Sequence, residues 1–124
     1  MPTEVEQYRT LVRRLLKKTR AKEISWDDGW TGDLECEFAS YKIRLSSEEG
    51  PEGSPLEVVQ ILNSSNQIID AFNDEDISDD SHPMGFPNYW KLMQELHKIA
   101  NRQAKGADAA LKNILDVLDD NDDL

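Results

Sequence analysis

The segment DLECEFASYKIRL, residues 33–45, decides the fold. Apolar and polar residues alternate on both sides of Ala39-Ser40, which is typical of two half-buried strands joined by a tight turn. A turn at Ala39-Ser40 pairs apolar with apolar residues on one face and acidic with basic residues on the other: Phe38–Tyr41, Cys36–Ile43, Leu34–Leu45, Glu37–Lys42 and Glu35–Arg44. Such cross-strand pairs contribute about 0.2–1 kcal/mol each. We therefore predict this hairpin in this register, with the three apolar pairs on its buried side.

A second hairpin is predicted from residues 56–63 and 67–72, around the turn signal Asn63-Ser64-Ser65-Asn66. Its first strand is apolar on both faces, through Val58, Val59, Ile61 and Leu62. Such a strand is either covered on both sides or central in its sheet.

Three amphipathic helices flank these hairpins. The first is predicted from about residue 4 to 20, with Thr3 and Glu6 at the spacing of a capping box. The second runs from about residue 88 to 105 and can end at Gly106. The third, which Asp108 can cap, carries an apolar stripe of Leu111, Ile114, Leu115 and Leu118.

The order of elements predicts an α+β fold, α-β-β-β-β-α-α. We expect a four-stranded antiparallel sheet of two hairpins, with the N-terminal helix and the two C-terminal helices packed on it. Residues 1–118 should form a single domain, and residues 119–124 an acidic, disordered tail.

The charge of the chain is divided unevenly. Residues 1–22 hold seven Lys or Arg against two Glu, a net charge of +5, whereas the remainder carries −16, so the 124 residues total −11. This excess of acid argues against nucleic-acid binding, because phosphate would be repelled. Cys36 is the single cysteine, so no internal disulfide can form, and no apolar run is long enough to span a bilayer. We expect a cytoplasmic protein without stable membrane association.

No pattern for metal, cofactor or catalytic chemistry is complete. Asp74, Asp76, Ser78 and Asp80 alternate like calcium-loop ligands, but Asp79 and Gly85 stand where that loop needs Gly and a bidentate Glu. His82, His97 and Cys36 lack metal-site spacing, and Cys36 alternates with Leu34 and Phe38 as an inward-facing, inert residue. We therefore predict no cofactor, no metal and no catalytic residue, although an enzyme whose site cannot be recognised from sequence remains a second alternative.

Two acidic segments are the candidate partner-binding residues. Tryptophan is enriched at binding hot spots, so Trp30 could serve as an apolar anchor within an acidic surface, unless it and Trp26 both belong to the core. The candidates are Trp30, Asp27, Asp28, Asp74, Asp76, Asp79 and Asp80.

The polar face of the first helix is a candidate basic contact face, formed by Arg9, Arg13, Arg14, Lys17 and Lys18. It can be a solvated face balanced by the acidic body of the same or a neighbouring molecule. It can also meet an acidic protein or an anionic membrane, although the charge of −16 on the remainder disfavours a membrane. The third helix can likewise complete the core or dock on a second copy in a homodimer.

These observations favour a small acidic, non-enzymatic protein-binding module that docks on a basic partner protein. Immunity proteins and antitoxin-like inhibitors are similar in this respect, because complementary charge raises their association rate and specificity. The alternative is a homodimeric, chaperone-like escort of a client protein, which the chain resembles in size and charge.

Overall fold

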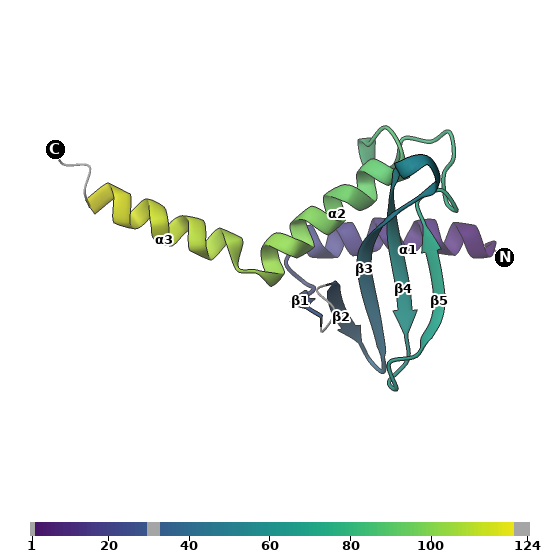
Figure 1. Ribbon diagram of the computed structural model, residues 1–124, viewed down its shortest axis with the longest axis horizontal. Helices are drawn as coiled ribbons and strands as arrows, with labels where there is room; N and C mark the ends of the chain where they lie inside the picture. The colour runs from purple at the N-terminus through teal and green to yellow at the C-terminus, as the bar shows by residue number, and fades with distance from the viewer. Residues whose placement is uncertain (1, 30–32, 121–124) are drawn as a thin grey trace.

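The computed structural model describes residues 2–29 and 33–120. Its helices and strands follow each other as one α+β arrangement (Figure 1). They are α1 (Glu4–Arg20), β1 (Asp27–Asp28), β2 (Leu34–Phe38), β3 (Tyr41–Glu49), β4 (Pro55–Leu62), β5 (Ile68–Asn73), α2 (Tyr89–Ala104) and α3 (Ala107–Asp120), with short 3-10 turns at Pro51–Gly53 and Pro83–Gly85.

The five strands form an antiparallel meander in the order β1-β2-β3-β4-β5. Helices α1 and α2 lie across one face of this sheet, and α3 extends from the body at the end opposite to the N-terminus (Figure 1). The core between the two layers comes from α1, the sheet and α2, and includes Val12, Leu16, Leu34, Val59, Phe72, Ile77, Tyr89, Leu92 and Leu96.

The predicted register of the first hairpin is confirmed at all five residue pairs. Leu34, Cys36, Ile43 and Leu45 are buried as predicted. The expected burial of Phe38 and Tyr41 is wrong, because both are exposed, 41 % and 50 % respectively. This pair adjoins the turn, where the chain reverses and the layer of helices gives incomplete cover. Ala39 in the turn adopts a positive φ of 55°.

The second hairpin is confirmed as well. Asn63 organises its turn, because its side-chain oxygen accepts hydrogen bonds from the backbone amides of Ser65 and Gln67. Strand β4 lies between β3 and β5, and its neighbours Val58 and Val59, which point to opposite faces, are both buried. Strand β4 is therefore apolar on both faces because it is an interior strand of the sheet.

Local signals set the helix ends. Thr3 caps α1, and its hydroxyl accepts a hydrogen bond of 3.1 Å from the amide of Glu6. Asn88 caps α2 through the amide of Lys91. After Lys105, Gly106 takes a φ of +67°, which ends α2 because this left-handed conformation favours glycine.

Two features of the predicted fold need correction. The sheet has a fifth strand, β1, whose two residues pair with Glu35 and Leu34 and form one edge. The last helix is present, but it does not pack on the sheet: every α3 side chain that the structure describes beyond Ala107 is exposed. Its residues Asp119 and Asp120 were expected to begin the acidic tail, of which residues 121–124 lie outside the described part.

Candidate functional site

Helix α3 presents an apolar surface that nothing in the described chain covers. Its large apolar side chains are between 50 % and 60 % exposed: Leu111, Ile114, Leu115, Val117 and Leu118. At 3.6 residues per turn, these side chains and Ala107 and Ala110 span roughly 160° of the helix circumference. An apolar stripe this wide is typical of a helix that faces a core. We call this surface the α3 stripe.

The opposite side of α3 is polar and mainly acidic, with Asp108, Lys112, Asn113, Asp116 and Asp119. Asp116 and Asp119 have no partner among the residues that the structure describes. Of these two carboxylates, Asp119 lies nearer the edge of the α3 stripe, whereas Asp116 lies opposite its centre.

Two ion pairs hold the base of α3 and the end of α2. Arg102 donates to the carboxylate of Asp108 at 2.6 Å, and Lys105 lies 3.2 Å from Asp28 on the edge strand β1. Exposed pairs of this kind contribute little, about 0–1 kcal/mol each. A cavity of about 470 Å³ lies beside this junction, between the ends of α1 and α2 and the start of α3. The base of α3 is thus anchored by weak surface contacts.

Of the acidic candidates at the start of the sheet, one forms an ion pair and one is exposed. Asp27 is exposed on β1, and Asp28 belongs to the ion pair with Lys105. Trp30 lies outside the described residues. Trp26 is a core residue, 3 % exposed, whose indole nitrogen donates a 2.9 Å hydrogen bond to the hydroxyl of Thr19.

The acidic loop after β5 is internally bonded rather than loosely solvated. Asp74 is buried and accepts a 2.8 Å hydrogen bond from the amide of Glu57, and burial raises the pKa of its carboxyl group. The Asp76 carboxylate accepts from the amide of Asn73. Two of the candidates thus organise the loop.

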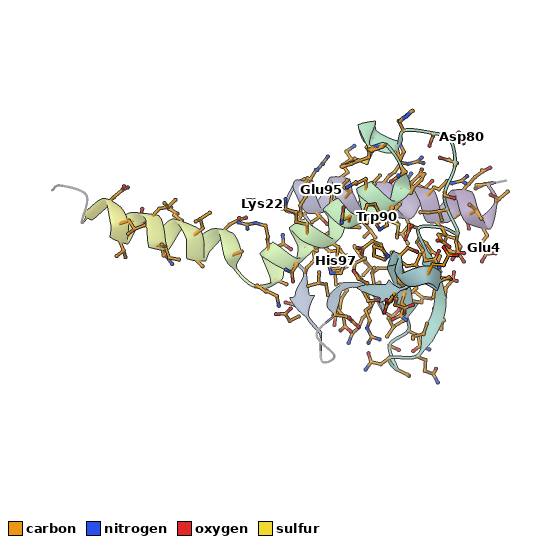
Figure 2. The ribbon with its side chains drawn as sticks, turned by 45° about the horizontal axis from the view of Figure 1, so that its top comes forward. Glu4, Lys22, Asp80, Trp90, Glu95 and His97 are labelled. Atoms are coloured by element: carbon orange, nitrogen blue, oxygen red, sulfur yellow. The ribbon has the colours of Figure 1, made fainter. Side chains whose placement is uncertain are left out.

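Asp79 and Asp80 complete this loop. The hydroxyl and amide of Ser81 donate to Asp79 and lower the pKa of its carboxyl group, and Arg9 lies 3.4 Å away. Asp80 is exposed, at the end of the molecule far from α3 (Figure 2). Because β1 and β5 are opposite edges of the sheet, the structure does not bring the two acidic segments together.

The basic face of α1 contains some residues that hold the fold together and others that are exposed. Arg9 donates to the backbone carbonyls of Ile77 and Ser78, and Arg13 donates to the hydroxyl of Tyr89, so both hold the fold together. Lys18 forms an exposed pair with Glu23. Arg14 and Lys17 are exposed. Arg14 has no partner in the part of the chain that the structure describes, whereas the hydrogen bond from Lys18 and the charge of Lys17 both lower the pKa of the Glu23 carboxyl group.

Beside Arg14 lies a shallow apolar depression that sequence reasoning missed. We call it the α1 groove: it has a volume of about 160 Å³ and is lined by Leu11, Arg14, Leu15, Lys18, Ile24 and Phe38. Arg14 and Lys18 bring positive charge to its rim. The sequence shows Leu11 and Phe38 as apolar residues, but only the folded structure shows that Phe38 lies next to α1.

A polar cluster between β3, β4 and α2 was also missed, because its members are far apart in sequence. Ser47 donates to the buried carboxylate of Glu57, and Nδ1 of His97 lies 3.0 Å from the same carboxylate and 3.4 Å from the Ser47 hydroxyl. A serine–histidine–acid relay needs the two imidazole nitrogens to contact different partners. Here both contacts use Nδ1 and the serine donates to the acid, so the cluster lacks the geometry of a nucleophile relay.

Cys36 is buried, and desolvation raises the pKa of its thiol to about 12, so the reactive thiolate is scarce at neutral pH. Among the described residues, no group of three or more His, Cys, Asp or Glu side chains is arranged to hold a metal ion. In the same part of the chain, no helix has the length and apolar character needed to cross a bilayer.

Comparison with known proteins finds no matching family model, no matching curated protein and no matching solved structure. The α3 stripe is consequently the feature of the described surface that most needs a functional explanation.

Proposed function

We propose that this chain is a non-enzymatic protein-binding module that uses α3 to contact a basic partner protein. The partner surface would combine an apolar groove with a rim of Lys or Arg. The observation that carries this proposal is the exposure of at least half of each large side chain in the α3 stripe.

Helix stability supports a covered α3. A helix of 14 residues is marginal in water by itself, and helices in proteins gain most of their stability from packing of an apolar face. The α3 stripe is wide enough for such packing, but the body of the molecule does not provide it. A second protein surface would supply the missing contact.

The energetics indicate how much α3 can contribute. Full burial of a Leu, Ile or Val side chain contributes about 1.5–3 kcal/mol, so covering the exposed half of five of them contributes roughly 4–8 kcal/mol. Association costs about 4–15 kcal/mol in lost freedom. The stripe alone therefore supports weak binding, and a tight complex needs flanking charges.

Electrostatics favours a basic partner. The chain carries −11, and Asp119, which lies near the edge of the α3 stripe, has no partner among the described residues. Complementary charge raises association rates and excludes partners of the same sign. These charges support a contact on α3 rather than on the Asp74–Asp80 loop, whose carboxylates are partly bonded within the loop.

The test is capture of binding proteins from host lysate by the tagged chain, washed at low and high salt. The double variant Leu111→Ser with Leu118→Ser disrupts the stripe, and Ala109→Ser with Asn113→Ser is the matched control on the polar side of the same helix. We expect a basic protein that the wild type and the control retain at low salt, that high salt releases, and that the stripe variant loses. Equal capture by the stripe variant would contradict the proposal.

A second candidate, a chaperone-like escort, is favoured by the edge strand β5. Ile68 and Ile69 are about half exposed there, and a free strand edge can add an extended client segment by backbone hydrogen bonding. A client that is lost with Ile69→Lys but retained by the α3 stripe variant would favour this function over the first.

A further inference from the structure

The chain itself carries a surface with the chemistry that α3 requires. The α1 groove is apolar at its centre, through Leu15, Ile24 and Phe38, and basic at its rim, through Arg14 and Lys18. We infer that α3 of one copy docks in the α1 groove of a second copy, and that the exchange is reciprocal, so that a twofold dimer covers both α3 stripes. This inference rests on the proposed role of α3 as the contact element. It names the α1 groove of a second copy as the surface that covers α3 when no partner protein is bound.

The α1 groove has room for one apolar side chain of α3. The α1 groove has a volume of about 160 Å³, and an apolar cavity of about 150 Å³ holds a benzene-sized group. A single Leu or Ile of the α3 stripe can therefore enter the groove. The next turn of α3 would then lie along Phe38, which is 41 % exposed and offers an apolar wall.

The charges are complementary at the same place. Arg14 has no partner among the described residues, and neither does Asp119, which lies near the edge of the α3 stripe. The pair that Lys18 makes with Glu23 is exposed and readily exchanged. Each copy carries −11, but exposed charges more than about 8 Å apart are largely screened at physiological ionic strength. Local attraction at the rim can thus outweigh the long-range repulsion.

Reciprocity is what favours a second copy over closure within one chain. A twofold interface repeats each contact, so two α3 stripes are covered for a single loss of translational and rotational freedom. In the single chain, α3 extends away from the body, with its base held through Asp108 and Lys105 (Figure 1). For α3 to reach its own groove, the helix would have to turn back at Gly106.

The first test is the molar mass in solution, measured by sedimentation across a range of concentrations. We expect the wild type to dimerise, and Arg14→Glu to weaken the dimer at least tenfold. Lys17→Glu is the matched control, because Lys17 is also exposed on α1 but does not line the groove. Circular dichroism checks that each variant is folded.

Complementation tests the reciprocal exchange directly. The stripe variant (Leu111→Ser with Leu118→Ser) and a groove variant (Phe38→Ser with Arg14→Glu) should each be monomeric. Their mixture should form a heterodimer, because the groove of the first variant still accepts α3 of the second. Arg14→Glu combined with Asp119→Lys in one chain should restore part of the lost affinity.

Three results would overturn the inference. They are a monomeric wild type at every concentration, a dimer that neither variant weakens, and a mixture that stays monomeric. Failure here is distinguishable from failure of the proposed function. If the chain is monomeric but the stripe variant still loses the basic partner, the dimer is wrong and the proposed function stands. If the dimer forms as described but the stripe variant captures the partner as well as the wild type does, the proposed function is wrong.

Discussion

At the scale of single residues, several buried polar groups of this protein have specific partners, although the indole nitrogen of Trp90 is buried without one among the described residues. Thr19 accepts a hydrogen bond from the Trp26 indole, and Asp74 accepts one from the amide of Glu57. Such bonds matter because a buried donor or acceptor left without a partner costs about 1–3 kcal/mol. Side chains that look like an acidic binding patch in the sequence can therefore be structural.

Asp74 offers a test of this view. Burial raises the pKa of its carboxyl group in the folded protein, so the folded state binds a proton more tightly than the unfolded state. Its contribution to stability is consequently present at acidic pH and is lost as pH rises through the folded-state pKa. We expect Asp74→Asn, which keeps an oxygen acceptor for the Glu57 amide, to raise the melting temperature at pH 7.

The difference between Asp74→Asn and the wild type should shrink on acidification, because the wild-type carboxyl group then becomes neutral. The comparison variant is Asp74→Ala, which leaves the Glu57 amide without its acceptor and should lower stability by about 1–3 kcal/mol. Thermal melts of the three proteins between pH 4 and pH 8 measure both effects. A stability of Asp74→Asn as low as that of Asp74→Ala would contradict this account.

At the scale of elements, α1 does more than cover the sheet. Arg9 reaches across to the loop after β5 and donates to the carbonyl groups of Ile77 and Ser78 at 2.9 and 3.1 Å. Ile77 is fully buried beneath this contact. The basic face of α1 therefore fixes the path of the acidic loop.

We predict that Arg9→Ala loosens this loop selectively. Loss of two hydrogen bonds to backbone carbonyls should cost about 1–3 kcal/mol. Amide hydrogen exchange should accelerate over residues 77–82 while α2 remains protected. Arg14→Ala on the same helix is the control, because Arg14 has no partner among the described residues; equal effects of the two variants would count against the assignment.

Sequence patterns predicted some elements better than others. The first hairpin was predictable because its two faces impose the same register independently, through Cys36–Ile43 and Glu35–Arg44. Strand β1 was not, because Asp27 and Asp28 show no apolar alternation and are paired through their backbone with β2. The exposure of Phe38 depends on where the helix layer ends, which alternation does not report.

The candidate site was harder to predict than the fold. An amphipathic helix such as α3 has the same pattern whether it completes its own core or docks elsewhere, so the sequence left both roles open. The acidic candidates looked alike in sequence, but Asp74 is buried and Asp80 is exposed. Hydrogen bonding across elements separates them, and local sequence does not specify it.

At the scale of the whole molecule, a packed body is distinct from a projecting helix. The core joins α1, the sheet and α2, whereas the α3 stripe remains in solvent (Figure 1). The charge follows the same division, because among the described residues the unpaired Arg14 lies on α1 and the unpaired Asp116 and Asp119 lie on α3. The proposed contact element and the α1 groove thus lie at separate places on the molecule.

This division predicts that the body does not depend on the stripe. Under dilute conditions, Leu111→Ser with Leu118→Ser should change the free energy of unfolding by no more than about 0.5 kcal/mol for each site, as for surface substitutions. Leu96→Ala in the core face of α2 should cost about 2–5 kcal/mol. Urea titrations followed by tryptophan fluorescence give both values, and a large loss in the stripe variant would mean that α3 packs on its own body.

The most direct test of the central claim, that α3 is a contact element covered by another protein surface, is hydrogen exchange of residues 107–120 at several protein concentrations, with and without a captured partner. We predict fast exchange in dilute solution and protection when the concentration rises or the partner is added, while α1 and α2 stay protected throughout. Protection of α3 that is equally strong at every dilution, or absent even in the complex, would contradict the account.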